Sequence, residues 1–349
     1  ENLAKSLVAS MDLAKGTVVE PQHLRVLSPG QGLSAQNYEK LLGCIVQRDM
    51  LEEDYFFPSD LQDTRVEPRT YKFNRPWGVP VRYHDFDEYH SKISPDVFEF
   101  HLSYSDLDLN INEFLTGEYE CGFVVHAPEL FSGSRLMDLA SPDEEYRQYS
   151  VRETQRVIDI TRSLKKYFPA TERPMIVANI GGFTMDELLP SGQLVSYYDR
   201  FADSLSLLDM EGVELIPQTM APFPWHFGGQ RYQNLFVHAD ECRHWCEQLN
   251  LRMCFDISHS RLMSNHFDVD FYEFAEKIAP ITGHLHLGDA LGVNGEGLQI
   301  GEGDIDFKKL IGILDKHCPT ASFIPEIWQG HKNGGEGFWI ALEKLETII

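Results

Sequence analysis

The segment RMCFDISH, residues 252–259, decides the fold, because a short apolar run ends at Asp256 and a polar residue, His259, follows three positions later. Two later segments repeat the design: GHLHLGD at residues 283–289 and SFIPEIW at residues 322–328. Each is a run of the length and apolar character of a buried strand, and each ends in side chains that can carry chemistry. Polar residues where buried parallel strands end are typical of barrel enzymes.

The same alternation continues outward from these segments toward residue 77 and toward the carboxyl end. Strand patterns alternate with helical ones, which predicts a parallel sheet with helices outside it. The eight expected strands are Gly78–Val81, Val97–His101, Gly122–His126, Met175–Asn179, Val213–Gln218, Arg252–Asp256, Gly283–Leu287 and Ser322–Glu326. The six expected helices are Asp143–Tyr167, Leu194–Leu208, Leu235–Leu249, Val269–Ile278, Phe307–Leu314 and Gly337–Thr347. Eight such units predict an α/β fold, a closed (β/α)8 TIM barrel, for which about 250 residues is typical.

The first sixty residues have a different pattern. Short apolar runs are separated by turn residues, and Gly16, Gly30 and Gly32 stand where the chain must reverse. We expect a small β domain over residues 1–64, a polar linker over 65–76 and the barrel over 77–349. A chain that opens on Glu1 already inside a strand pattern is expected to be part of a longer polypeptide.

The charge balance limits the partners. The chain has 349 residues with 54 acidic against 30 basic side chains, a formal net charge of -24. Such a field repels phosphate backbones and anionic lipids, so we expect neither a nucleic acid nor a membrane as a partner. No segment approaches the run of about 20 apolar residues that spans a bilayer, and the six cysteines are scattered as reduced thiols would be. A cytoplasmic protein is expected.

The strand ends predict a metal site. Asp256, His286 and Glu326 end three successive strands, and Gln218 ends the strand before them. We predict that these residues bind one divalent ion, with Mn²⁺ or Zn²⁺ favoured and Co²⁺ or Mg²⁺ left open. Asp256 alone is equally explained as a helix cap. His284 and His286 face the same way on a strand, so one of them can be a hydrogen-bonded core residue.

The reaction and its substrate give further candidates. Glu326 and His259 are the expected catalytic acid or base groups, and His126 or His226 could serve as the base instead of His259. Trp225 could stack on a sugar ring, although ordinary loop packing explains it as well, and Arg231 could meet a phosphate or a carboxylate. The full set of expected substrate-binding residues is His126, Asn179, Trp225, His226, Arg231, Trp328 and Lys332.

Residues 1–64 resemble the SAF (antifreeze-like) domain of sialic acid synthases. The strings that carry the resemblance are SLVA at residues 6–9, DLAKG at 12–16, PGQGLS at 29–34 and LLG at 41–43. The resemblance implies a role in a homodimer, with the SAF domain as a candidate for the interface, and a link to the synthesis of sialic-acid-like sugars. Where that family has a substrate-binding arginine, this chain has Lys5, which keeps the charge but lacks the bidentate fork. A passive spacer is the alternative role.

Residues 76–349 resemble the xylose-isomerase-like barrels, which include sugar isomerases, epimerases and apurinic endonucleases. The strings that carry the resemblance are VHAP at residues 125–128, FDISH at 255–259, HLHLGD at 284–289, IGEGDIDF at 300–307 and IPEIW at 324–328. The resemblance implies a metal-dependent sugar or sugar-phosphate isomerase or epimerase. Where the endonucleases have a zinc-binding histidine this chain has Asn179, and their later Asp-x-His pair is absent around residues 295–298, which argues against DNA repair.

One departure from the isomerase pattern affects the chemistry. The family has a metal-binding glutamate at the place of Gln218, and resemblance assigns proton transfer to that glutamate together with Glu326. An amide cannot take a proton near neutral pH. Two other readings therefore stay open. The barrel could be a retired catalyst that serves as a carbohydrate-binding or scaffold module, or it could be a metal-dependent lyase or dehydratase that needs one strong base.

Overall fold

The computed structural model describes residues 5–28, 30–61, 66–223 and 231–349. The chain divides into two compact units, one formed by residues 1–68 and 329–343 and the other by residues 69–328 and 344–349. The domain boundaries at residues 64 and 76 stay a prediction. Among the described residues, none of the helices has the length and apolar character that crossing a bilayer requires.

The first unit is small β structure around one apolar core. Strands β1 (Ser6–Ala9) and β2 (Leu24–Leu27) pair antiparallel, and isolated bridges such as Leu13 to Met50 and Val18 to Ile45 tie in the remaining segments. The short helices are η1 (Pro21–His23), η2 (Ala35–Asn37), α1 (Tyr38–Leu41) and η3 (Pro58–Leu61). Ten buried apolar residues form the core: Leu7, Ala9, Leu13, Val19, Leu24, Leu33, Leu41, Val46, Met50 and Phe56.

The second unit is a closed parallel barrel, as predicted. Its strands are β3 (Gly78–Val81), β4 (Val97–His101), β5 (Gly122–His126), β8 (Met175–Ala178), β10 (Glu214–Pro217), β12 (Met253–Asp256), β13 (Thr282–Leu287) and β16 (Ser322–Pro325). Strands β3, β4, β5, β8 and β10 form one parallel run, and β12, β13 and β16 form another. Parallel bridges from Gln218 to Cys254 and from Trp77 to Phe323 join the two runs into a ring.

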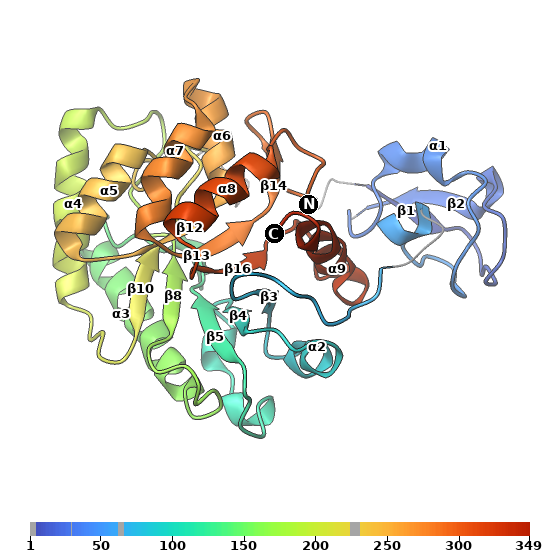
Figure 1. Cartoon of the computed structure of the whole chain (residues 1–349), viewed down its shortest axis with the longest axis horizontal. Coiled ribbons are helices and arrows are strands. Elements are labelled where there is room, and N and C mark those ends of the chain that lie inside the picture. The colour runs from blue at the N-terminus through green and yellow to red at the C-terminus, as the bar shows by residue number, and fades with distance from the viewer. Residues whose placement is uncertain (1–4, 29, 62–65, 224–230) are drawn as a thin grey trace. The chain divides into compact units, whose positions relative to one another are not determined.

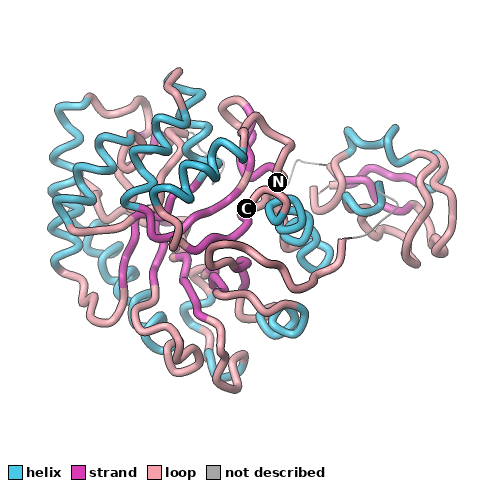
Figure 2. Tube along the Cα trace, viewed as in Figure 1, coloured by secondary structure: helices cyan, strands magenta, loops and turns pink. Residues whose placement is uncertain are grey.

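Helices lie outside the ring of strands (Figures 1 and 2). They are α2 (Phe86–Lys92), α3 (Glu144–Leu164), α4 (Ser191–Ser206), α5 (Ala239–Leu249), α6 (Ile257–Phe267), α7 (Phe271–Ile278), α8 (Phe307–His317) and α9 (Lys332–Glu346), with η4 (Asp106–Asp108), η5 (Ile111–Glu113) and η7 (Ala279–Ile281). The prediction gave no bounds for α2 and α6. It also started α9 late, because left-handed residues at Asn333, Gly334 and Gly335 interrupt its first turns.

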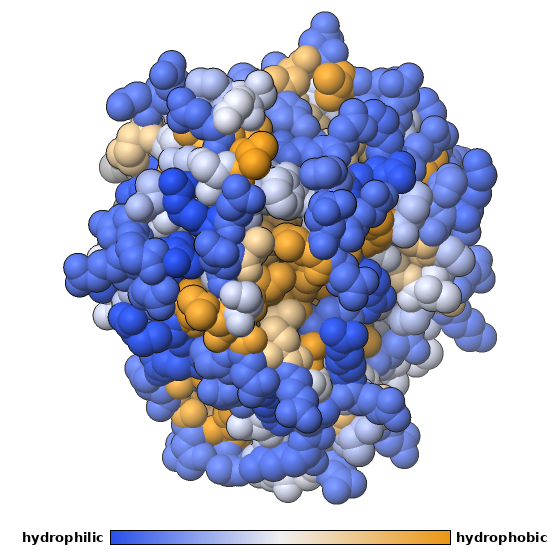
Figure 3. Space-filling view, turned by 90° about the vertical axis from the view of Figure 1, so that its left-hand side faces the viewer, coloured by the Kyte–Doolittle hydropathy of each residue, from blue (hydrophilic) through white to orange (hydrophobic). Residues whose placement is uncertain are grey.

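Short pairs of antiparallel strands lie in the segments that connect the main strands of the barrel. Strands β6 (Leu130–Phe131) and β7 (Arg135–Leu136), β9 (Phe183–Thr184) and β11 (Tyr232–Gln233), and β14 (Asp289–Leu291) and β15 (Gly295–Leu298) pair antiparallel. The face drawn in Figure 3 is mostly hydrophilic, with apolar side chains gathered near its middle. The hydrophilic surface accords with the large excess of acidic over basic side chains.

The IGEGDIDF string, residues 300–307, turns out to be a loop held by one buried carboxylate. Asp289 is fully buried, and its oxygens accept the backbone N–H groups of Gly301 at 2.9 Å, Gly303 at 3.0 Å and Ala290 at 2.8 Å. A Cβ on Gly303 would lie 2.2 Å from the carbonyl oxygen of Ala290, so only glycine fits there. The most specific string of the sequence therefore has a structural explanation, which is to fix the loop after β13.

Candidate metal and proton-transfer site

The four residues predicted as metal ligands meet at one end of the barrel, because the strands are parallel and each residue ends its strand or follows it. Nδ1 of His286 lies 2.9 Å from Oε2 of Glu326 and 3.6 Å from Oδ2 of Asp256. The amide nitrogen of Gln218 lies 3.1 Å from the same Oδ2 of Asp256. His286 and Asp256 are buried, while the side chain of Glu326 is 34% exposed and thus reachable from outside.

Asp256 performs both of the roles that the sequence left open. One carboxylate oxygen, Oδ1, accepts the backbone N–H of His259 at 2.8 Å and so caps helix α6. The other oxygen, Oδ2, faces Gln218 and His286. The cap fixes the side chain, and the free oxygen is left to the site. Burial raises the pKa of this carboxyl above its ordinary value.

His126 belongs to the same cluster, although the sequence assigned it to substrate binding alone. Ligand atoms of His126, His286 and Glu326 lie within 4.8 Å of one another, which is close enough for a single ion. Nε2 of His126 is also 3.0 Å from the side-chain oxygen of Gln218. The rings of His101 and His126 stack with centroids 4.8 Å apart, and those of His126 and His286 with centroids 5.6 Å apart.

His259 lies beside the cluster, between two carboxylates. Its Nδ1 is 3.3 Å from Oδ2 of Asp256, and its Nε2 is 3.0 Å from Oε1 of Glu296 on β15. Burial lowers the pKa of this imidazole, but Asp256 and Glu296 outweigh burial and hold the pKa well above its ordinary value. Glu296, the carboxylate at Nε2, is partly exposed, whereas His259 is buried.

One atom of the site, Nδ1 of His286, lies where a positive charge is favoured. Nδ1 of His286 is buried and makes no hydrogen bond, although two carboxylates lie within 3.6 Å of it. Burial lowers the pKa of this imidazole, but Cys254, Glu326 and Glu99 outweigh burial and hold it well above the ordinary value. Positive charge is therefore favoured at Nδ1, either as a proton or as a divalent ion that takes the place of the proton.

The other expected substrate residues are distributed more widely. Asn179, directly after β8, is buried and accepts the backbone N–H of Gly181 at 3.0 Å. Arg231 lies near the buried carboxyl of Asp138, whose pKa burial raises to about 7. Trp328 is 54% exposed. Lys332 donates to the side-chain oxygen of Gln31 at 2.6 Å within the first unit. Substrate contacts at these four residues stay predictions.

Two of the expected residues, Trp225 and His226, lie outside the described residues. Two others were missed. Glu99, in the middle of β4, is fully buried and contacts three histidines, and Glu296 is the partner of His259. A signal for Glu99 existed, since a carboxylate inside the apolar strand VFEFH needs a charged or hydrogen-bonded partner, the argument that the sequence supported for Glu326. Glu296 sits in a glycine-flanked hairpin, where an acidic residue carries no signal.

Comparison with known proteins supports the architecture. The family model of the xylose isomerase-like TIM barrel matches residues 94–346, and that of the SAF domain matches residues 4–62. No curated protein matches the chain in sequence.

Among solved structures, a D-tagatose 3-epimerase-like protein superposes with a TM-score of 0.56 at 22% identity, covering 78% of this chain and 98% of its own. The D-psicose 3-epimerase of Clostridium cellulolyticum H10 gives 0.55 at 14% identity, covering 78% and 97%. An L-ribulose 3-epimerase gives 0.52 at 16% identity, covering 78% and 93%. At these identities the likeness shows a shared fold. Together with the length of the match to the family model, it places residues 94–346 of the chain in the xylose isomerase-like TIM barrel family, behind an amino-terminal SAF domain.

Proposed function

We propose that the barrel is a divalent-metal-dependent isomerase or epimerase of a sugar or sugar phosphate. The observation that carries the proposal is the environment of His286, whose buried Nδ1 faces two carboxylates without making a hydrogen bond to either. A cation between these groups would satisfy all three at once. Glu326, Asp256 and Gln218 supply the remaining oxygen donors, and His126 supplies a second nitrogen.

The ion would polarise a sugar carbonyl and the neighbouring hydroxyl when it is bound. Glu326 is the residue placed to move the proton, because its carboxylate is partly exposed and reaches the same cluster. Burial raises the pKa of Glu326, but His286 above all outweighs burial and holds it well below the ordinary value, so this carboxylate is ionised and can accept a proton. Mixed imidazole and carboxylate donors favour Mn²⁺ or Zn²⁺, with Co²⁺ and Mg²⁺ as the other candidates.

Two-base epimerisation needs a second proton-transfer group, and Gln218 cannot be that group. The pair formed by His259 and Glu296 is our candidate, since its two side chains lie 3.0 Å apart and Glu296 is partly exposed. Glu296 would accept the proton, while the imidazole of His259, whose high pKa keeps it protonated, would donate to Glu296 and be held by Asp256 from the other side. This pair would replace the missing glutamate without adding a charge at position 218.

The SAF domain suggests the biological setting. In our proposal the barrel prepares or processes an amino sugar for the synthesis of sialic-acid-like nonulosonic acids, as part of a multidomain synthase. A homodimer, with the SAF domain as one candidate for its interface, belongs to the same proposal. The support is the pairing of an SAF domain at residues 4–62 with a sugar-epimerase type of barrel in one chain.

Gln218 favours a second candidate function. Its amide bridges His126, Asp256 and His259, so it occupies the space of the usual glutamate with hydrogen bonds of its own. A site of this kind, with Glu326 as its single proton-accepting carboxylate, suits a metal-dependent lyase or dehydratase. The remaining alternative is a barrel that binds carbohydrate as a scaffold and has no catalytic activity.

The test is proton exchange in deuterium oxide. The purified chain is incubated with hexosamines, ketohexoses and their phosphates, with Mn²⁺ or Zn²⁺ and with a chelator. We expect metal-dependent deuterium incorporation next to the carbonyl of one substrate class, and recovery of an isomer or epimer. Loss of water or cleavage of a carbon bond in the product would select the lyase. A chain that contains no stoichiometric metal, and whose melting temperature does not respond to Mn²⁺ or Zn²⁺, would select the scaffold.

A further inference from the structure

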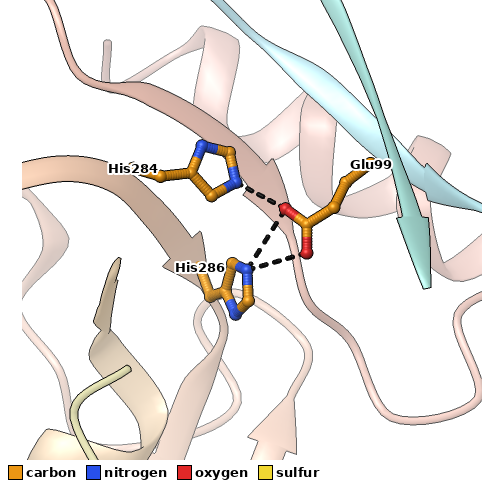
Figure 4. Close-up of side chains that lie close together, drawn as sticks. All are labelled: Glu99, His284 and His286. Carbon is orange, nitrogen blue, oxygen red and sulfur yellow. Dashed lines mark hydrogen bonds and ion pairs between the residues drawn. The ribbon is translucent and has the colours of Figure 1, made fainter. Parts of the chain in front are cut away.

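Glu99 and two histidines form a buried polar cluster beneath the candidate site (Figure 4). Nε2 of His284 lies 2.6 Å from Oε2 of Glu99, and Nε2 of His286 lies 3.0 Å from Oε1. All three side chains are fully buried. Residues 284 and 286 reach the same carboxylate because alternate residues of a strand face the same side. Strand β13 thus presents both rings to β4 across the barrel interior.

The positions of the protons follow from the chemistry of the acceptor. Ring nitrogens of His284, His286 and His101 lie within 3.0 Å of the carboxylate oxygens of Glu99, and a carboxylate can only accept hydrogen bonds. Nε2 of His284 and Nε2 of His286 must therefore carry a hydrogen, and in a neutral ring Nδ1 must then be an acceptor. The hydroxyl of Ser322 lies 2.7 Å from Nδ1 of His284 and can donate to it.

His286 differs from His284 at that second nitrogen. Among the described residues, Nδ1 of His286 makes no hydrogen bond, and Oε2 of Glu326 lies at 2.9 Å and Oδ2 of Asp256 at 3.6 Å from it. His284 therefore has partners at both ring nitrogens, whereas one nitrogen of His286 faces two carboxylates. A positive charge among the three groups completes this arrangement, either as a proton on Nδ1 or as a divalent cation.

We propose that Glu99 is a positioning residue that keeps the hydrogen of His286 on Nε2 and turns the Nδ1 lone pair toward a divalent cation at Asp256 and Glu326. This inference rests on the proposed function in requiring a cation at that place. Carboxylates that accept from the second nitrogen of a metal-binding histidine fix its tautomer and ring orientation, and they raise its basicity as a ligand. Glu99 itself does not touch the cation.

The short distances argue against Glu99 as a ligand in a second ion site. Two ligand atoms that each lie about 2.1 Å from one ion are about 3 Å apart at the right angle of an octahedral site and farther apart in a tetrahedral site. The 2.9 Å between His286 and Glu326 fits the octahedral spacing. The 2.6 Å between Glu99 and His284 is a hydrogen-bond length instead. The three groups would have to separate to admit an ion, in a part of the interior where none of them is exposed.

The experiment measures metal affinity in matched variants of the full chain. Mn²⁺ or Zn²⁺ is titrated against a competing chelator for the unchanged chain, for Glu99→Gln and for Glu241→Gln, the last removing a partly buried carboxyl on helix α5. We expect Glu99→Gln to weaken binding about 10- to 100-fold and Glu241→Gln to leave it unchanged. Glu99→Asp keeps the carboxylate but shortens the side chain by one methylene, so its metal affinity should lie between those of the unchanged chain and Glu99→Gln. Glu99→Asp also serves as the test if Glu99→Gln does not fold.

A second readout follows the tautomer directly. In the metal-free chain with ¹⁵N-labelled histidine, His284 and His286 should each show a downfield, slowly exchanging Nε2 proton, and Glu99→Gln should lose that of His286. Equal metal affinity in the unchanged chain and in folded Glu99→Gln would overturn the inference alone. Two ions bound per chain would overturn it as well, since Glu99 would then be a ligand. An unchanged chain that binds no metal would overturn both the inference and the proposed function.

Discussion

Two carboxyl groups of the barrel unit, the fully buried Glu99 and the partly buried Glu241, have pKa values shifted in opposite directions because their partners differ. Burial raises the pKa of both. At Glu241 the neighbour is the hydroxyl of Tyr198, which donates to it but brings no charge, and the pKa rises to about 7. At Glu99 the neighbours are the imidazoles of His286 and His284, and they outweigh burial. Burial alone therefore does not decide whether a carboxyl is ionised; the charge of the neighbour does.

The largest effect is expected at the carboxylate nearest to the proposed reaction. Glu326→Gln should lower metal-dependent deuterium exchange by about 10²- to 10⁴-fold, the usual contribution of a positioned acid or base. Glu241→Gln is the matched control, because it removes a carboxyl whose pKa is raised to about 7 and that lies outside the cluster. Equal losses in the two variants would mean that the exchange reports folding rather than proton transfer.

The second largest effect is expected in the pH dependence of stability, which distinguishes a carboxyl with a raised pKa, such as Glu241, from one with a lowered pKa, such as Glu99. Burial raises the folded-state pKa of Glu241 to about 7, against an ordinary value of 4.5. The folded chain therefore holds this proton longer than the unfolded chain, and the associated stability is complete below about pH 4.5 and is lost as pH rises to about 7. The loss is about 3 kcal/mol at most. Denaturant unfolding at several pH values should show a flatter profile for Glu241→Gln than for the unchanged chain.

An identical slope in the two proteins between pH 4.5 and 7 would remove Glu241 as the titrating group. The buried Asp138, whose pKa also rises to about 7, is then the next candidate. Asp138→Asn in the same experiment would test it. The remaining slope after both substitutions would belong to other groups.

Asp289 is a third kind of buried carboxyl, whose partners are backbone N–H groups rather than side chains. Asp289→Asn replaces an oxygen that accepts from Gly301 and Gly303 with an amide group that also donates. We expect a loss of about 2 kcal/mol in the free energy of unfolding. Chemical denaturation measures it, and Asp304→Asn on the same loop, where the carboxylate is a third exposed, is the control. Equal stability of Asp289→Asn would show that the loop does not depend on this carboxylate.

The sequence was sufficient to predict the repeating strands of the barrel. All eight strands were expected within one or two residues, because short apolar runs with polar ends are a strong local pattern. The sequence indicated α6 only as a helix that Asp256 could cap and gave it no bounds, because this helix begins directly at Asp256 with no loop between strand and helix. The convergence of Asp256, His286 and Glu326 followed from parallel strands in a closed ring.

Partners across the barrel could not be predicted in the same way. Glu99 and His284 are separated by 185 residues, and no local pattern links them. The same holds for His259 and Glu296, which meet because the β14 to β15 hairpin places Glu296 beside α6. Only the register between strands, which pairs Cys254 with His284 and Glu99 with Val124, brings such side chains to a common level.

The smallest expected effect concerns the one neutral member of the cluster. Gln218→Glu would place a carboxylate where the amide now donates to Oδ2 of Asp256 at 3.1 Å, so the metal-free chain should become less stable. With an ion present the added charge is attractive, and affinity for Mn²⁺ or Zn²⁺ should rise about tenfold. Gln233→Glu, a buried glutamine bound to backbone carbonyl groups, is the control for the loss of a buried amide. A gain in metal affinity together with faster deuterium exchange would mean that position 218 limits proton transfer, whereas a gain in affinity with slower exchange would mean that the neutral amide is part of the working site.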